Sequence, residues 1–159
     1  MSLTVRSDAF SDGHAIPVRH TEDGDDLSPA LSWTGTPKGT VEFALIVDDP
    51  DAPRPEPWVH WIVGKIPGDA TALPQGFRNE NAPAGAPAGL VYGRNTWGTV
   101  GYRGPAPPKG HGTHHYHFKL YALDAPLTMA AGTDKDALLQ AMSGHVLGHG
   151  ELVGTYQRP

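Results

Sequence analysis

The chain has 159 residues, a formal net charge of −5 at pH 7 and no cysteine, which excludes a disulfide framework, thiolate metal sites and a cysteine nucleophile. Twenty glycines and sixteen prolines bring it close to the roughly 25–30% at which Gly/Pro-rich chains are usually disordered. However, 38% hydrophobic residues and four tryptophans can build a core. The acidic balance argues against a nucleic-acid-binding protein, which usually carries a basic face.

The length predicts a single domain spanning residues 1–159. Met1 to Phe10 lacks the basic and apolar stretches of a signal peptide. No apolar run reaches the roughly 18–20 residues of a membrane span. We therefore expect a cytoplasmic protein without an integral membrane segment.

Short apolar runs predict a succession of strands. In chain order they cover residues 31–33, 43–47, 59–66, 90–92, 115–123 and 152–153. The run 115–123 alternates between two sets of side chains, which is typical of a half-buried strand. One set is His115, His117, Lys119 and Tyr121, and the other is Tyr116, Phe118, Leu120 and Ala122.

One late segment predicts a helix. Thr133 to Asp136 resembles a capping box with Asp in place of Glu, and a helical stretch follows to Met142. Gly144 and Gly148 weaken or end this helix. The Gly/Pro-rich segment 67–110 contains aromatic residues and is expected to be ordered loop. Several strands, long loops and one helix indicate a mostly-β sandwich or barrel.

Two loops at strand ends are candidates for function, because rigid scaffolds display binding residues there. The first, Asp49 to Pro57, has four prolines that leave it few conformations. Because X–Pro bonds have only a small cis penalty, we predict at least one cis bond here, at Ala52–Pro53 or Glu56–Pro57. The second loop, Gly104 to Gly110, leads to His114 and Tyr116.

The polar residues of these loops indicate an anion site. His114 and Tyr116 face the same side of a strand, and Asp49 would orient one imidazole and raise its pKa. His60 lies between Val59 and Trp61, where a lone histidine is more often a hydrogen-bonded core residue. Since the net charge disfavours anion binding, such a site must be local and partly buried.

Two motifs, in this order along the chain, resemble the phosphatidylethanolamine-binding protein family, which includes the Raf kinase inhibitor proteins. They are Asp49-Pro-Asp-Ala-Pro53 followed by Trp58 and His60, and Gly104-Pro-x-Pro-Pro108 followed by His114-x-Tyr116. Segments 28–33, 120–124 and 151–156 are similar to the bacterial branch of the family, so the resemblance covers nearly the whole chain.

The resemblance implies an antiparallel β-sandwich with one or two short helices and a small anion pocket. Its ligands would be phosphate-like groups: phospholipid head groups, nucleotides or a phosphorylated partner. The ligand-binding residues carried over by position are Asp49, Ala52, Pro53, Trp58, His60, Pro108, His114 and Tyr116. In this interpretation His60 and His114 are donors, Asp49 orients, and no cofactor, metal or catalytic residue is required. Asp51 is expected to hold the loop backbone.

Two departures from the family pattern limit what is transferred. His115 stands where the family often has Arg, so any ion pair at this position is expected to be weakened or absent. The chain stops at Pro159, soon after the last predicted strand, and is expected to lack the C-terminal helix that caps the pocket in eukaryotic members. Kinase modulation is therefore not transferred directly. A homodimer is expected by analogy with bacterial relatives.

Three alternatives stay open. His111, His114, His115 and His117 invite comparison with a cupin-like, metal-dependent enzyme, although strand alternation directs His115 and His117 away from His114. Hydrolysis lacks support, because no G-x-S-x-G elbow surrounds any serine. A protein-interaction module with a vestigial pocket, or one that reads a phosphorylated side chain, has the same composition as a small-ligand binder.

Overall fold

A computed structural model describes residues 3–159 of the chain. The predicted strands are all found, mostly with longer bounds, and two very short strands are added. The strands are β1 (Thr4–Arg6), β2 (Leu31–Thr34), β3 (Glu42–Asp49), β4 (Trp58–Pro67), β5 (Ala72–Leu73), β6 (Val91–Tyr92), β7 (His114–Leu123) and β8 (Val146–Tyr156); the helices are the 3-10 turn η1 (Val18–His20) and α1 (Lys135–Met142). Within residues 3–159, no helix combines the length and apolar character needed to cross a bilayer.

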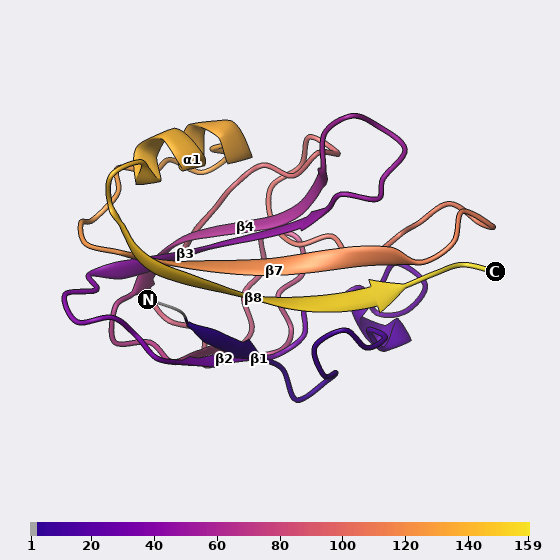
Figure 1. Cartoon of the computed structure of the whole chain (residues 1–159), viewed down its shortest axis with the longest axis horizontal. Coiled ribbons are helices and arrows are strands. Elements are labelled where there is room, and N and C mark those ends of the chain that lie inside the picture. The colour runs from indigo at the N-terminus through magenta and orange to yellow at the C-terminus, as the bar shows by residue number, and fades with distance from the viewer. Residues whose placement is uncertain (1–2) are drawn as a thin grey trace.

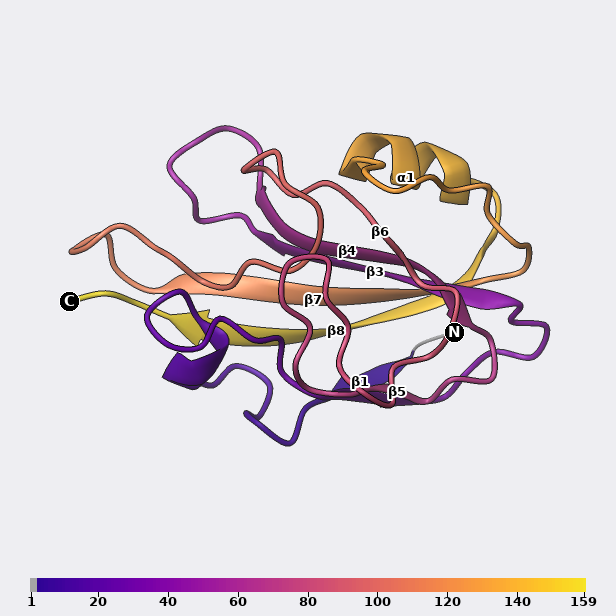
Figure 2. The ribbon, with the colours of Figure 1, turned by 180° about the vertical axis from the view of Figure 1, so that it is seen from behind.

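The strands form two antiparallel sheets. The larger sheet has the order β6-β4-β3-β7-β8, and the smaller has the order β1-β2-β5. Figures 1 and 2 show the smaller sheet lying along one face of the larger one. This arrangement confirms the predicted antiparallel β-sandwich.

The core lies between the sheets, because each contributes a row of alternating apolar side chains to it. Trp33 of the smaller sheet packs edge-on against Phe43 of β3, with ring centroids 5.4 Å apart. Phe118 and Leu120 of β7 face the same core, as the alternation of 115–123 predicts. Phe77 and Tyr102 are also fully enclosed, which confirms that segment 67–110 is ordered.

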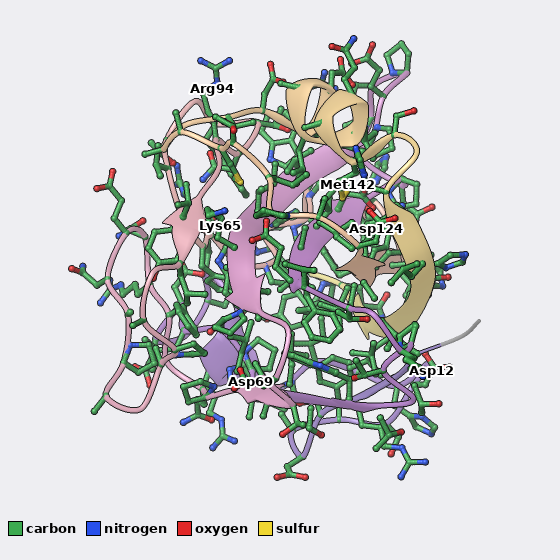
Figure 3. The ribbon with its side chains drawn as sticks, turned by 90° about the vertical axis from the view of Figure 1, so that its left-hand side faces the viewer. Asp12, Lys65, Asp69, Arg94, Asp124 and Met142 are labelled. Atoms are coloured by element: carbon green, nitrogen blue, oxygen red, sulfur yellow. The ribbon has the colours of Figure 1, made fainter. Side chains whose placement is uncertain are left out.

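Strand β3 is buried on both faces, since α1 covers the side of the large sheet that the small sheet leaves open (Figure 1). Leu138 and Met142 of α1 pack with Ala44 and Ile46 of β3, and Figure 3 shows Met142 between the helix and the sheet. Lys65 donates to Glu42 Oε2 at 3.1 Å and to the Leu127 carbonyl at 2.7 Å. This contact anchors the segment that leads to the helix.

The predicted helix exists, but it begins one residue later than the capping box indicates. Asp134 is the N-cap and accepts a hydrogen bond from the Ala137 amide at 2.9 Å. Thr133 does not cap this helix; its hydroxyl donates to the Ala130 carbonyl at 2.7 Å. The helix ends before Gly144, whose φ is +82°, as expected, whereas Gly148 lies in β8.

Strand β8 is much longer than the predicted Leu152–Val153. The prediction was too short because the glycines of this strand interrupt its apolar pattern. A Cβ at Gly150 would lie 2.1 Å from the Leu3 carbonyl oxygen, and one at Gly154 would lie 2.5 Å from Ile16. Glycine within a strand often marks such close backbone approach. The N-terminal segment therefore packs directly against β8.

Candidate functional site

Three segments meet at one end of the large sheet, at the right of Figure 1: the β3–β4 loop, the loop before β7 and the C-terminal tail. They surround a cavity of about 400 Å³. Its lining residues are Glu22, Asp49, Ala52, Pro53, Trp58, His60, Trp97, Ala106, Pro107, Pro108, His114, Tyr116 and Arg158. All eight residues predicted for the site line this one cavity; that they bind a ligand stays a prediction.

The remaining lining residues were not predicted. Pro107 belongs to the Gly104–Pro108 motif, and Trp97 is an aromatic residue in a Gly/Pro-rich segment, so both carried a weak signal. Glu22 and Arg158 had none, because they reach the cavity only through the tertiary fold. Arg103 donates to Glu22 Oε1 at 3.0 Å, and Arg158 donates to Asp23 at 2.8 Å.

A buried Asp–His pair forms the innermost polar contact of the cavity. Asp49 is the last residue of β3 and shares the inward face of Phe43, Leu45 and Val47 by strand alternation. Its Oδ2 lies 2.6 Å from His114 Nδ1, and both side chains are at most 4% exposed. Burial raises the pKa of Asp49, opposed by the His114 hydrogen bond. The carboxylate therefore fixes the orientation of the His114 ring.

The other nitrogen of His114 is occupied by a residue from the loop. His111 Nδ1 lies 2.6 Å from His114 Nε2, so one of these two atoms donates to the other. His111 is exposed, whereas His114 is 1% exposed. Any ligand that uses His114 Nε2 must therefore displace His111, a residue that the sequence did not assign to the site.

His60 reaches the cavity because β4 carries a β-bulge at this residue. Trp61 pairs with Val47 and Val59 pairs with Asp48, which leaves His60 as the extra residue between them. A bulge of this kind redirects side chains and is common beside functional sites. His60 consequently lines the cavity, although the neighbouring Trp61 already occupies the inward face.

The contacts of His60 favour an acceptor facing the cavity instead of the predicted donor. Its Nδ1 lies 2.8 Å from the Arg103 carbonyl oxygen, which can only accept, so this nitrogen keeps the proton. Burial lowers the pKa of His60 to about 4, so the ring is neutral at pH 7 and Nε2 is a bare acceptor. Within residues 3–159 Nε2 has no hydrogen-bond partner, and the atom itself is not completely buried. It therefore opens to the cavity.

Tyr116 supplies a hydroxyl beside His60. The two rings meet edge-on with centroids 5.1 Å apart. The hydroxyl makes no hydrogen bond to the rest of the described chain, yet the residue is 1% exposed and lines the cavity. Burial, reinforced by the charge of Asp49, raises the pKa of Tyr116 far above 10. The phenol therefore stays protonated and can donate.

Aromatic rings form one wall of the cavity. Trp97 meets the Trp58 ring edge-on at 5.3 Å and the His60 ring at 4.9 Å. The Arg103 guanidinium lies 4.4 Å from the centre of the Trp97 ring, a favourable cation–π distance. Since the same arginine supplies the carbonyl that binds His60, it links the wall to the polar floor.

The β3–β4 loop is held by local hydrogen bonds, without the predicted cis proline. Every peptide bond of the described residues is trans, so that prediction is wrong; the trans form of an X–Pro bond is favoured by about 0.5–1 kcal/mol. The chain turns through side-chain and backbone contacts instead. Asp49 Oδ1 accepts from the Asp51 amide at 2.8 Å, and the Arg54 amide donates to the Ala52 carbonyl at 2.7 Å.

Asp51 and His115 lie outside the cavity. Asp51 Oδ2 accepts from both the amide and Nδ1 of His115, each at 2.8 Å, so this carboxylate holds the start of β7 rather than its own loop. His115 therefore makes a contact at the position where an ion pair was expected to be weakened or absent. Both side chains are at least 40% exposed, and such exposed pairs contribute only about 0–1 kcal/mol.

The histidines do not converge as a cupin-like site would require. His115 and His117 are on the outward face of β7, and His117 Nδ1 lies 3.2 Å from Glu151 Oε2. Within residues 3–159 there is no group of three or more His, Cys, Asp or Glu side chains arranged to hold a metal ion. His111 and His114 are the pair that does meet.

Comparison with protein families and curated proteins places this architecture among known relatives. The family model described as phosphatidylethanolamine-binding protein matches residues 6–157. A UPF0098 protein of Methanothermobacter thermautotrophicus is 48% identical over 98% of this chain and 99% of its own length. A protein of Mycobacterium tuberculosis that carries the name lipoprotein LppC is 40% identical over 98% of this chain and 72% of its own length.

Solved structures give the same result. YbcL of Escherichia coli, described as a new member of the mammalian family of these proteins, superposes with a TM-score of 0.91 at 32% identity, and the alignment covers 100% of both chains. A homologue from Chlamydia trachomatis has a TM-score of 0.87 at 36% identity over 99% of both chains. The similarity therefore extends over the whole sandwich, including the segments that line the cavity.

Proposed function

We propose a function from one premise: this chain belongs to the phosphatidylethanolamine-binding protein family, whose model matches residues 6–157. The chain acts as a non-catalytic binding protein, and its cavity takes the phosphate-like group of a small ligand or of a phosphorylated partner. His114 and Tyr116 donate to the bound oxygens, and Asp49 holds the His114 ring in place. The tryptophan and proline residues form the wall around the group.

The observation that carries this proposal is a set of unpaired polar atoms on buried residues that line one cavity. His60 Nε2 and the Tyr116 hydroxyl are on residues no more than 4% exposed, line a cavity of about 400 Å³, and have no partner within residues 3–159. Buried polar groups are nearly always hydrogen-bonded. A ligand or ordered water must complete these bonds, and a tetrahedral oxyanion is small enough for the cavity.

Thermal protection tests the proposal. A ligand that binds only the folded state stabilises it by about 2.7 kcal/mol at 100 times its Kd. We expect phosphate, phosphoethanolamine or a nucleotide to raise the Tm of the wild-type chain. His114→Ala should abolish this protection, because it removes both the ring that lines the cavity and the partner of Asp49.

A matched control separates ligand binding from general destabilisation. His115→Ala alters the next residue on the outward face of β7, where its side chain is 49% exposed. This variant should keep the full ligand-induced Tm shift. An equal shift in wild type and His114→Ala, or no shift with any phosphate compound, would contradict the assignment.

The remaining features of the function are part of the same proposal. We infer a single domain, a cytoplasmic location and a homodimer. We also infer that the chain modulates kinases or other signalling proteins by binding a protein partner. The relative named as a lipoprotein makes fractionation the direct test of location. If only a phosphorylated peptide binds, and no small anion does, the interaction-module alternative replaces small-ligand binding.

A further inference from the structure

We propose that this cavity selects, among phosphate-like anions, those that still carry one P–OH group: phosphomonoester monoanions and dihydrogen phosphate rather than phosphodiesters or sulfate. The inference rests on the proposed function, since it concerns the ligand of the same site. The chemistry shared by the selected ligands is a tetrahedral oxyanion that both accepts and donates hydrogen bonds.

The tautomer of His60 is fixed by its contacts. Its Nδ1–H is directed at the Arg103 carbonyl oxygen, 2.8 Å away, and the Arg103 amide in turn donates to the His60 carbonyl at 3.2 Å. These reciprocal contacts lock the ring beside the cavity. Nε2 is therefore an acceptor. An unprotonated ligand oxygen beside Nε2 would be repelled by the lone pair of this nitrogen.

Burial strengthens this argument, because it keeps His60 neutral. The side chain is 4% exposed and is enclosed by Trp97 and Tyr116 at ring-centroid distances of 4.9 and 5.1 Å. Its lowered pKa, about 4, means that a bare anion gains little by protonating the ring at neutral pH. A P–OH group, by contrast, can donate to Nε2 without moving any proton.

The charges around the cavity favour a weakly charged ligand. The charged lining residues are Glu22, Asp49 and Arg158. Glu22 is already paired with Arg103 at 3.0 Å, and Arg158 is paired with Asp23 at distances of 2.8 to 3.1 Å. A monoanion that presents a donor to one side suits this surrounding better than a dianion.

The test compares ligands that differ in the P–OH group. Phosphoethanolamine and glycerophosphoethanolamine share the ammonium group, but only the first is a monoester. At about pH 6, close to the second pKa of phosphomonoesters, a large share of it carries the proton. By calorimetric titration of the full chain, we expect the monoester to bind roughly 10- to 100-fold tighter, the range of one hydrogen bond to a charged group.

Sulfate controls for size, and a second arm identifies the source of the phosphoryl group. Sulfate has the shape of phosphate but no proton near neutral pH, so it should bind more weakly than inorganic phosphate by a similar factor. Both inorganic phosphate and phosphoethanolamine meet the requirement. Their relative Kd values distinguish a free anion from an esterified head group or metabolite.

His60→Asn tests whether the histidine causes the selectivity. The asparagine amide can still donate to the Arg103 carbonyl, but it places no acceptor at the position of Nε2. The monoester-to-diester ratio should fall towards one, mainly through weaker monoester binding. His115→Asn, on the outward face, should leave the ratio unchanged.

Ring nitrogen NMR of the wild-type chain keeps the inference testable if the His60 variant does not fold. The Nε2 signal should be that of an unprotonated nitrogen and should shift when phosphoethanolamine binds. Equal binding of diester or sulfate, or unchanged selectivity in a folded His60→Asn chain, overturns the inference while the proposed function stands. Absence of binding by every phosphate compound overturns both.

Discussion

At the scale of single residues, the two histidines of the cavity direct Nδ1 at different partners. His114 is oriented by Asp49 at 2.6 Å and keeps Nε2 for a second partner. His60 donates a hydrogen bond from Nδ1–H, its only ring N–H, to a backbone carbonyl at 2.8 Å. The residue type is the same, but the surroundings of Nε2 differ: this atom faces His111 in His114 and the cavity in His60.

The position of His111 leads to a prediction at this scale. Since His111 Nδ1 competes for His114 Nε2 at 2.6 Å, we expect His111→Ala to tighten phosphoethanolamine binding by about 2- to 10-fold, the range of one ordinary hydrogen bond. Calorimetric titration measures the change, with His117→Ala on the outward face as the control. Weaker binding would mean instead that His111 itself contacts the ligand.

At the scale of elements, small irregularities position the site. The bulge in β4 turns His60 inward, and the end of β3 places Asp49 opposite His114 at the start of β7. A close approach of the chain is equally important at Gly104, where a Cβ would lie 2.3 Å from the His20 carbonyl oxygen. These contacts hold the loop before β7 against the rest of the molecule.

The start of α1 gives a prediction that separates two N-caps. Asp134→Ala removes the side-chain oxygen that accepts from the Ala137 amide, and such losses typically cost about 0.5–2 kcal/mol of stability. Thr133→Ala should cost less, below about 0.5 kcal/mol, as most exposed substitutions do. Urea unfolding of both variants measures the free energies, and the reverse order would restore Thr133 as the cap.

At the scale of the whole molecule, burial of histidine links stability to pH. The pKa of His60 is about 4 in the folded chain, below its ordinary value of 6.5, because burial disfavours the charged ring. Burial lowers the pKa of His20 in the same direction. Between pH 6.5 and about pH 4, the unfolded chain binds a proton at His60 that the folded chain does not bind, so the free energy of unfolding falls as pH falls.

We expect His60 to contribute a loss of about 3 kcal/mol between pH 6.5 and pH 4, from the size of its pKa shift. The raised pKa values of Asp49 and Asp26 act with the opposite sign, so the measurement must isolate His60. Unfolding free energies of wild type and His60→Asn should converge as pH is lowered through this range. Parallel pH profiles for the two chains would contradict the expectation.

Much of the fold and of the site followed from local patterns. Alternation along 115–123 predicted the burial of Phe118 and the inward direction of Tyr116, because side chains alternate strictly along a strand. The length of β8 was missed, since Gly150 and Gly154 are required by packing and carry no pattern of their own. The helix start was misplaced by one residue, because Thr133 and Asp134 are both good capping types and only their contacts distinguish them.

The sequence by itself determined which residues could form the site: the motifs around Asp49, His60, Pro108 and His114 contain all eight predicted residues, and these line one cavity. Tertiary structure decided what those members do. It directed the Nδ1–H of His60 at the Arg103 carbonyl, placed His111 beside His114, and brought Glu22 and Arg158 to the cavity. The reason is physical: hydrogen-bond direction and burial depend on partners distant in sequence, and no local pattern contains them.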